Sequence, residues 1–413
     1  MSLLTSSAKP PFGLFIAGLS TTQIVSWGTT FYLPSILERQ IGRDLGVGRE
    51  LIFGGVTVML IVAALIGPRI GRYIDKNGTS LTMMAGCLMI ATGLCLIGVS
   101  TGPVSYLAGW ALFGFAVPLS MSIAAFAAVA QAYPERGRAG ITTLMLFGGL
   151  SSGIIWPLTG WLDAQVGWRA TCFIYAGLQI GLCLPLKLLL TRAQRAQFRL
   201  HGLPADSQAI MPLLLPQDRS AAFWLLVVGS GVSGLVSWGL PLYFVSMFIT
   251  GGLETGPAIV LASVQAYFTV LARAVDLGIA RRVGGMRLVS AASLLSPVCF
   301  LMLIIGIGTV PPGIWQIAVI GLGMALYGFA TGMIAAGRAT LPLELFGSGG
   351  YAATLGKLSF WLNLMFAASP VLFALLYGGL GKMTTLWIAM IGAIIAAIAY
   401  WRLDRLVREG KPA

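Results

Sequence analysis

One short pattern occurs twice in this chain, once in each half. Residues 24–32 read Ile-Val-Ser-Trp-Gly-Thr-Thr-Phe-Tyr, and residues 235–243 read Leu-Val-Ser-Trp-Gly-Leu-Pro-Leu-Tyr. Of the 413 residues, 57% are hydrophobic and only 9% are charged, so too few polar groups remain to cover one large soluble domain. A half-length repeat in such an apolar chain predicts two parallel bundles of membrane helices with a binding site between them.

A helix needs about 20 mostly apolar residues to cross the hydrocarbon core of a bilayer. Twelve segments meet this requirement, six on each side of the most polar connection. We therefore predict an all-α membrane protein whose twelve transmembrane helices form two pseudo-symmetric six-helix bundles, at 1–190 and 221–413, joined by a cytoplasmic linker at 191–220. The predicted spans are 12–36, 51–72, 80–100, 104–132, 140–162, 168–190, 221–249, 256–280, 288–308, 314–341, 350–378 and 383–402.

The basic residues predict how the chain is threaded, because Lys and Arg are enriched in cytoplasmic loops. With the N-terminus inside, most of them, including Lys9, Lys187 and Lys411, fall on the cytoplasmic side. We predict a multi-pass protein of a bacterial-type inner membrane with both termini cytoplasmic. The net charge of +13 therefore reports orientation and not nucleic-acid binding. The basic residues that fall on the outer side are Arg39, Arg43, Arg49, Arg169 and Lys382.

The sequence shows no pattern typical of catalysis or metal binding. All five cysteines fall inside predicted spans, at spacings that match neither a zinc site nor a disulfide framework. The single histidine lies in the 191–220 linker, and no serine–histidine–aspartate set or phosphate-binding loop is present. We expect a protein that is not an enzyme, needs no cofactor or metal, and exists as a monomer surrounded by membrane lipid.

A glycine and an aspartate mark the loop between the second and third spans, where residues 71–78 read Gly-Arg-Tyr-Ile-Asp-Lys-Asn-Gly. Gly71 allows a neighbouring helix to approach closely. Asp75, followed by Lys76, can accept hydrogen bonds from a helix N-terminus or pair with an arginine. Such a latch would hold one conformation and must break in another.

The fifth span has glycines at 149, 153 and 160 around Pro157, and Gly-Trp-Arg follows at 167–169. The 71–78 loop and this helix resemble the signatures of the major facilitator superfamily, and Gly-Trp-Arg resembles its monocarboxylate porter and oxalate–formate exchanger branch. The resemblance implies the major facilitator fold and secondary transport by alternating access, in which the fifth helix bends as the two halves rock. The residues to which we assign gating are Gly71, Asp75, Lys76, Gly153, Pro157 and Asp276.

Two charged residues lie well inside predicted spans, Arg273 in the eighth and Lys357 in the eleventh. A charge at that depth costs about 2.5–3.5 kcal/mol on insertion scales, so it usually faces a cavity and serves a function. Arg offers a planar fork for a carboxylate, and Lys adds a point charge. The same pair resembles the cationic pair of the oxalate–formate exchanger. Asp276 and Arg338 are expected to form ion pairs at loop level; alternatively, Arg273 pairs with Asp276 or reaches the cytoplasm.

Aromatic and polar residues could complete the cavity. Trp27 and Trp238, matched by the repeat, would face each other if their helices line the path. For each aromatic or polar candidate other than these two tryptophans, the alternative role is packing or anchoring at the membrane interface. The residues to which we assign substrate binding are Arg273, Lys357, Trp27, Trp238, Tyr32, Tyr243, Gln265, Trp156 and Asn363.

We therefore predict transport of a small organic anion, a mono- or dicarboxylate, by alternating access. The monocarboxylate porters usually carry an aspartate one turn before the arginine, where this chain has Thr269. For want of a buried carboxylate, exchange or uniport is favoured over proton symport. The alternative is an efflux pump for drugs, toxic metabolites or arsenicals, which would need a large apolar cavity. A receptor is a third possibility, but the short linker and tails leave no output domain.

Overall fold

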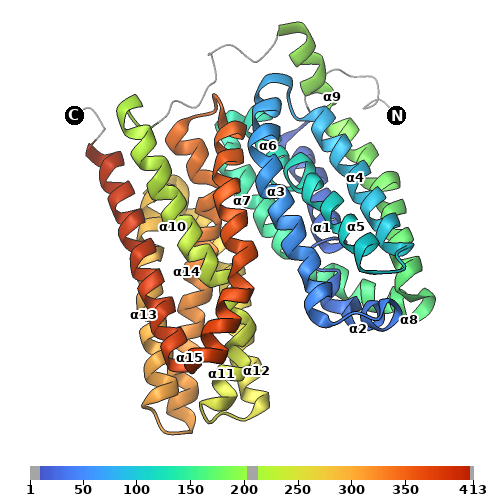
Figure 1. The fold of residues 1–413 in the computed structure, drawn as a ribbon. Coiled ribbons are helices and arrows are strands. Elements are labelled where there is room, and N and C mark those ends of the chain that lie inside the picture. Colours follow the sequence, from blue (N-terminus) through green and yellow to red (C-terminus); the bar gives the residue numbers. More distant parts are fainter. Residues whose placement is uncertain (1–9, 202–212, 410–413) are drawn as a thin grey trace. The chain divides into compact units, whose positions relative to one another are not determined.

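The computed structural model describes residues 10–201 and 213–409, and this part of the chain contains helices and no strand (Figure 1). Lys9, Lys411 and residues 202–212 of the predicted linker lie outside the described residues. The chain divides into two compact units. Unit 1 comprises residues 1–211 and 346–363, and unit 2 comprises residues 212–345 and 364–413.

Unit 1 contains the N-terminal helices together with the first turns of the last helix, from residue 351 to 363. Two short π-helical segments interrupt its α-helices. In chain order the elements are α1 (Phe12–Gly28), α2 (Pro34–Leu45), α3 (Arg49–Asn77), α4 (Ser80–Gly98), α5 (Pro103–Ala116), the π-helical η2 (Val117–Met121), α6 (Ile123–Ala132), the 3₁₀ turn η3 (Pro134–Arg136), α7 (Gly137–Gly149), α8 (Ser151–Leu178), the π-helical η4 (Gln179–Cys183) and α9 (Leu184–His201).

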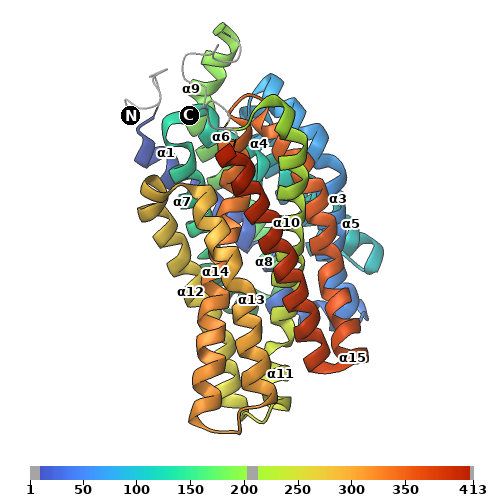
Figure 2. The ribbon, with the colours of Figure 1, turned by 90° about the vertical axis from the view of Figure 1, so that its left-hand side faces the viewer.

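Unit 2 contains the remaining helices, and the last of them, α15, begins in unit 1 and continues through unit 2. Figure 2 shows α13 and α14 running side by side. In chain order the elements are the 3₁₀ turn η5 (Pro216–Asp218), α10 (Arg219–Gly239), the 3₁₀ turn η6 (Leu240–Tyr243), α11 (Phe244–Thr250), α12 (Thr255–Val283), α13 (Gly285–Gly308), α14 (Ile314–Phe346) and α15 (Tyr351–Glu409).

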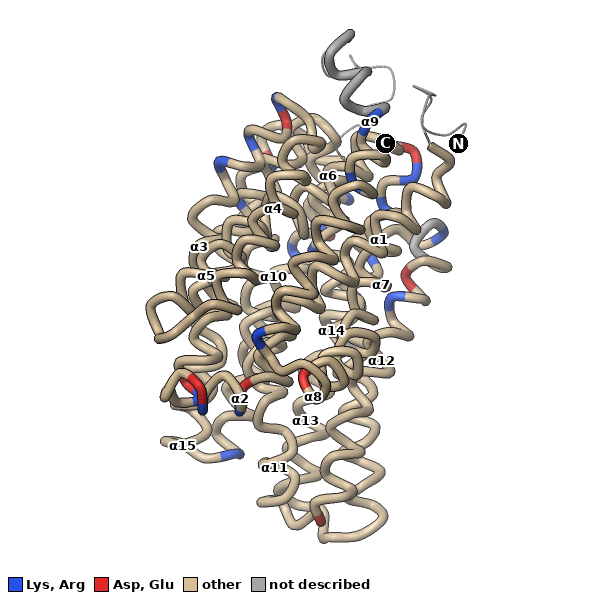
Figure 3. The backbone as a smooth tube through the Cα atoms, turned by 90° about the vertical axis from the view of Figure 1, so that its right-hand side faces the viewer, with Lys and Arg blue, Asp and Glu red and all other residues tan. Residues whose placement is uncertain are grey.

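Nine helices in the described part are long and apolar enough to cross a membrane, and long stretches of them carry no charged residue (Figure 3). Two of the nine, at 134–192 and 351–409, contain a glycine with non-helical backbone angles, Gly167 at φ 78° and Gly381 at φ 77°. A left-handed glycine is a common end of an α-helix, and each separates spans that the sequence predicts as distinct. The count of twelve spans stays a prediction.

The two copies of the sequence repeat make the same contact in their own units. In unit 1 the Ser151 hydroxyl donates a hydrogen bond to the Ile24 carbonyl at 2.6 Å. In unit 2 the Ser369 hydroxyl donates to the carbonyl of Leu235, which occupies the same place in the repeat as Ile24. A serine on a partner helix thus satisfies a carbonyl near the end of the first long helix of each unit. The repeat therefore preserves a structural contact.

Glycines set the helix spacing in unit 1. Trp110 of α5 is completely buried against α3, where a Cβ at Gly55 would lie 2.5 Å from Trp110 Cδ1. The hydroxyl of Tyr106, one turn earlier on α5, donates to the Ile52 carbonyl at 3.0 Å. In lipid, where apolar burial drives helices together only weakly, close packing of this kind and hydrogen bonds between helices hold the bundle.

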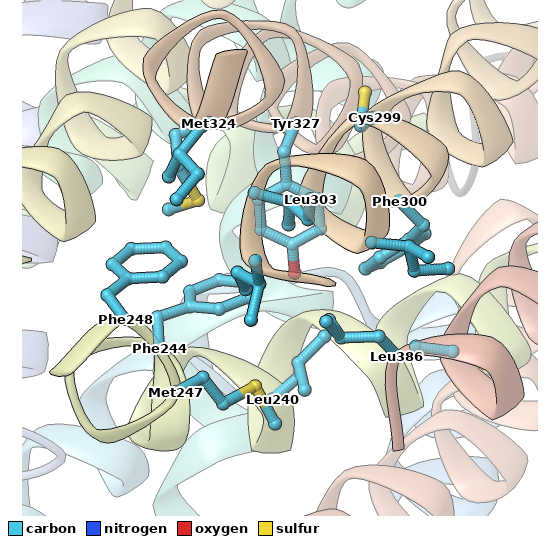
Figure 4. Close-up of a cluster of buried hydrophobic side chains, with 14 of the residues drawn as sticks. Leu240, Phe244, Met247, Phe248, Cys299, Phe300, Leu303, Met324, Tyr327 and Leu386 are labelled. Atoms are coloured by element: carbon cyan, nitrogen blue, oxygen red, sulfur yellow. The ribbon is translucent and has the colours of Figure 1, made fainter. Parts of the chain in front are cut away.

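A cluster of aromatic and aliphatic side chains forms the core of unit 2 (Figure 4). The rings of Phe244 and Phe248 stack with centroids 5.8 Å apart, and Phe244 meets Tyr327 edge to face at 5.4 Å. Helices α13 and α14 approach closely because Gly306 leaves room for Ile320, whose Cγ1 would lie 2.7 Å from an added Cβ. Met324 and Tyr327 of α14 belong to this core. The core therefore holds in place the helix that also carries Arg338.

Gly55→Ala should destabilise the protein by about 1–3 kcal/mol, because the added methyl group overpacks a buried indole ring. Gly54→Ala is the matched control, since no atom outside the helix lies within 4 Å of a Cβ at Gly54, and alanine favours the helix by up to about 1 kcal/mol. Thermal unfolding in detergent measures both effects. Equal melting temperatures for the two variants would contradict the packing of α3 on α5.

Candidate functional site

In unit 1, Asp75 at the end of α3 holds the N-terminus of α15. Its two carboxylate oxygens accept hydrogen bonds from the backbone N–H groups of Ala352 at 3.1 Å and Ala353 at 2.8 Å. The first N–H groups of a helix have no partner within the helix and carry partial positive charge, so a carboxylate satisfies both needs. A helix N-terminus is one of the two partners expected for this aspartate from the sequence, and the structure shows that geometry.

Glycines bring the backbones of α3 and α15 into direct contact beside this aspartate. A Cβ at Gly71 would overlap the Ala352 carbonyl oxygen, and a Cβ at Gly356 would lie 2.5 Å from the Gly67 carbonyl oxygen. Gly67 and Gly71 are four residues apart and therefore lie on one face of α3. Larger residues at these positions would push the helix N-terminus away from Asp75. The gating roles of Gly71, Asp75 and Lys76 stay predictions.

Among the substrate-binding residues predicted in unit 1, the structure brings one pair together. The rings of Tyr32 and Trp156 meet edge to face with centroids 6.0 Å apart. Trp27 contacts Phe31 in the same manner, also at 6.0 Å. Lys357, on the part of α15 that belongs to unit 1, is exposed, and Asn363 is half-buried.

In unit 2, an arginine and two aromatic rings form a continuous set of contacts. Trp238 of α10 stacks on Phe366 of α15, with ring centroids 4.8 Å apart and an interplanar angle of 9°. The guanidinium carbon of Arg338 in α14 lies over the Phe366 ring, 5.1 Å from its centroid. Gly234 of α10 makes the space, because a Cβ there would overlap Phe366 and lie 3.0 Å from Arg338 Nη1. We call these residues the Arg338 stack.

From the sequence we predicted that Arg338 forms an ion pair at loop level. The structure shows that this prediction is wrong. Arg338 makes no hydrogen bond or ion pair with any other described residue. Helix α14 continues to Phe346, so Arg338 lies eight residues, or about 12 Å, from its end. A guanidinium has five N–H donors, and only its face is occupied here, by Phe366. Its donors are therefore available to a ligand.

A second arginine lies near the Arg338 stack. Arg273 of α12 is close enough to Arg338 for the two positive charges to repel each other. Asp276, three residues further along α12 and on the same face, is almost completely buried at 1% exposure.

A cavity of about 20 Å³ lies beside Arg338, between α10, α13, α14 and α15. It is lined by Ser237, Ser296, Thr331 and Tyr327 among others. This volume holds about one water molecule. The Tyr327 hydroxyl is buried without a hydrogen-bond partner in the described part of the chain, and Figure 4 shows it directed away from the α14 backbone. The cavity therefore supplies a further donor next to the guanidinium.

The other predicted residues of unit 2 and of α8 make structural contacts. Tyr243 packs on Tyr377 with ring centroids 5.3 Å apart. The Gln265 carbonyl accepts a hydrogen bond from the Thr269 side chain at 2.8 Å, so the residue in place of the porters' aspartate is bound to its own helix. Pro157 lies inside α8. One turn earlier, a Cβ at 153 would meet no atom within 4 Å, so glycine is not required there for packing.

Lys187 of α9 is a buried cation that the sequence analysis placed on the cytoplasmic side. It is completely buried, and its Nζ donates to the carbonyl oxygen of Ser120 at 3.3 Å and to the Ser120 hydroxyl. Ser120 lies in the π-helical segment η2, where the regular carbonyl ladder is interrupted. Gln23 donates to the same carbonyl at 3.2 Å. Lys187 and Gln23 thus satisfy a backbone group that the π-turn exposes.

The same signal could have located both Arg338 and Lys187. Each lies three residues before the end of a predicted span, and further leucines follow it in the sequence, such as Leu341, Leu343 and Leu190. The helices continue along these residues, to Phe346 and His201 respectively. Where a charged residue lies near the end of a predicted span and apolar residues follow it, the helix should therefore be predicted to continue through those apolar residues.

Taken together, the long apolar helices define a protein that crosses the membrane several times. The model of the Major Facilitator Superfamily matches residues 14–346, and the chain belongs to this family. No curated protein sequence matches the chain significantly. The finer resemblance to the monocarboxylate porter and oxalate–formate exchanger branch stays a prediction.

Solved transporters share the fold. The human organic anion transporter MFSD10 (TETRAN) superposes with a TM-score of 0.63 at 18% identity, over 95% of this chain and 100% of that chain. A bacterial homologue of the iron transporter ferroportin, in an outward-facing state with soaked iron, superposes with a TM-score of 0.72 at 12% identity, over 96% and 99% of the two chains. At these identities the likeness shows the fold alone.

Asp75→Ala should speed hydrogen exchange at the amides of Ala352 and Ala353, because the first turn of α15 loses its acceptor. Lys76→Ala is the matched control, since Lys76 is the exposed neighbour of Asp75. Exchange of the peptide covering residues 346–363, followed by mass spectrometry, gives the comparison. If Asp75→Ala leaves this peptide as protected as in the control, the carboxylate does not hold the helix.

Proposed function

We propose that this protein is a secondary transporter of small organic anions, and that Arg338 binds the carboxylate of its substrate. The observation that carries the proposal is the Arg338 guanidinium, two turns inside an apolar helix without an acceptor among the described residues. A charge in this environment is energetically costly, so a charge that is kept there usually serves a function. A carboxylate fits the planar fork of donors in a bidentate geometry.

The surroundings of Arg338 favour an anion with an apolar body. Arg273 adds a second positive charge nearby. Trp238 and Phe366 offer flat apolar surface beside the guanidinium. The Tyr327 hydroxyl and the serines of the cavity can hydrogen-bond a second oxygen atom. A small aromatic or aliphatic monocarboxylate matches this set of groups.

The residues predicted in unit 1 remain candidates for the same pathway. Lys357, Trp27, Tyr32, Trp156 and Asn363 would then contact the substrate at another stage of alternating access. Of the two structural neighbours, one is an organic anion transporter and the other an iron transporter. The two neighbours therefore do not indicate whether the substrate of this chain is an anion or a cation. The proposal rests on the residue types around Arg338.

Efflux of drugs, toxic metabolites or arsenicals is the alternative function. An exporter of amphiphilic cations needs a large apolar cavity, often with an acidic residue. Among the described residues that line the cavity beside Arg338, none is acidic, and Arg338 itself is a cation. These features support the anion proposal over efflux of cations.

Arg338→Ala should abolish the stabilisation of the purified protein by small monocarboxylates, because a ligand that binds only the folded state raises apparent stability. Arg338→Lys should weaken binding at least tenfold, or about 1.4 kcal/mol, since lysine keeps the charge but loses the fork. Thermal-shift titration against mono- and dicarboxylates, amphiphilic drugs and arsenicals measures both.

Arg287→Ala serves as the control for this titration, because Arg287 is an exposed arginine in the first turn of α13. Arg273→Ala and Lys357→Ala show whether these two residues share the site. The proposal fails if Arg338→Ala responds to carboxylates as Arg287→Ala does. Loss of binding in Lys357→Ala but not in Arg338→Ala would move the site to unit 1.

The transport mode depends on Asp276. The sequence favours exchange or uniport because it finds no buried carboxylate, but α12 continues to Val283 and buries Asp276. A proton-binding group within the membrane is therefore present. We retain exchange as the prediction, and Asp276 is the residue on which proton symport would depend.

Proteoliposomes with and without internal anion test the mode. Exchange predicts uptake only into vesicles that hold a counter-substrate, with no response to an imposed pH gradient. Uptake into empty vesicles that follows an inward proton gradient, and that is lost in Asp276→Asn, would replace exchange with proton symport. The anion site itself is unaffected by this outcome.

A further inference from the structure

A groove of about 610 Å³ lies between the beginning of α10 and the end of α15 in unit 2. It shares no residue with the cavity beside Arg338. Trp224 of α10 and Trp401 of α15 form part of its walls, and each is about half exposed, at 48% and 49%. Arg402 and Arg405 of α15 also line it. Its volume is within the range of ligand-binding sites, about 300–1,000 Å³.

The depth of the two tryptophans places the groove at the membrane surface. The second part of α15 starts at Gly381, where the backbone is non-helical. Trp401 is twenty residues further on, or about 30 Å, which matches the hydrocarbon thickness. Trp224 lies in the second turn of α10, which begins at Arg219. Tryptophan is enriched at the boundary between hydrocarbon and headgroups, so the groove opens at headgroup level.

A packed contact closes the inner end of the groove. The hydroxyl groups of Ser230 and Tyr400 lie 2.9 Å apart and share a hydrogen bond. A Cβ at Gly229 would lie 3.0 Å from the Tyr400 ring, so α10 and α15 touch at this level. The groove therefore extends from Tyr400 toward the membrane surface. The shape fits a molecule that enters from the lipid.

Among the described residues around the groove, one arginine has no hydrogen-bond or ion-pair partner. Arg405 Nε lies 2.7 Å from Glu409 Oε1, and the Arg408 guanidinium pairs with Asp404. Arg402 is exposed and makes no hydrogen bond or ion pair with another described residue. The charged residues that line the groove are Arg402, Arg405 and Glu409, so its lining carries a net charge of +1.

We propose that this groove binds the headgroup of one anionic phospholipid, such as phosphatidylglycerol or cardiolipin. The phosphate diester carries the negative charge that complements Arg402, and the arginine fork fits two phosphate oxygens. Trp224 and Trp401 flank the glycerol region, and the acyl chains follow the apolar surface of α10 and Val228 into the hydrocarbon. Basic pockets between transmembrane helices bind anionic lipids in this way.

Native mass spectrometry of the full chain in detergent tests the proposal. The wild-type protein and Arg287→Gln, a control that changes an exposed arginine of α13 outside the groove, should retain one phosphatidylglycerol or cardiolipin and little phosphatidylcholine. The double variant Arg402→Gln/Arg405→Gln should retain the anionic lipid at least fivefold less. Arg402→Lys should retain it to an intermediate extent, because it keeps the charge without the fork.

Three results would overturn the proposal. The first is equal retention of anionic lipid by the double variant and the control. The second is equal retention of phosphatidylcholine and phosphatidylglycerol by the wild-type protein. The third is the same thermal stabilisation by inorganic phosphate as by the lipid, which would indicate an ion site alone. The melting temperature of each variant without added lipid shows that it is folded, and both substituted arginines are exposed.

Discussion

The positive charge of Arg338 within an apolar helix is the constraint on which the account of this protein depends. The membrane offers no water to solvate a guanidinium, so the protein or a ligand must supply its partners. Phe366 and Trp238 supply an aromatic surface, and Gly234 supplies the room for it. These contacts hold the guanidinium in place without occupying its N–H donors. A site that is positioned but unsatisfied is what recognition of an anion requires.

Two other charged side chains, the buried Lys187 and the partly buried Asp75, are satisfied within the fold. Lys187 is held by Ser120 in a π-turn, and Asp75 is held by the first N–H groups of α15. Both therefore serve the arrangement of helices, with close glycine contacts at Gly71 and Gly356 beside Asp75. The contrast separates structural charges, whose partners belong to the chain, from Arg338, whose partner we assign to the substrate.

Much of the architecture could be predicted from composition, because a chain this apolar must form membrane helices. The glycine-aspartate loop also predicted a local contact that the structure shows, between Asp75 and the N-terminus of a helix. The site was predicted less well, since hydropathy ends a span where charges begin, whereas helices continue for as long as tertiary contacts stabilise them. This is why Arg338 and Asp276 were placed near the cytoplasmic ends of their spans and expected to form ion pairs at loop level. Side-chain stacking, as in Phe366 on Trp238, leaves no periodic signal in sequence.

The most direct test of the central claim is to locate a bound carboxylate experimentally. A bromine-substituted analogue of the carboxylate that stabilises the protein most would be bound to crystals of the full chain, and its anomalous signal measured. We predict a bromine peak beside the rings of Trp238 and Phe366, with the carboxylate within hydrogen-bond distance of the Arg338 guanidinium. A well-occupied carboxylate elsewhere in the protein, with Arg338 left unoccupied, would contradict the account.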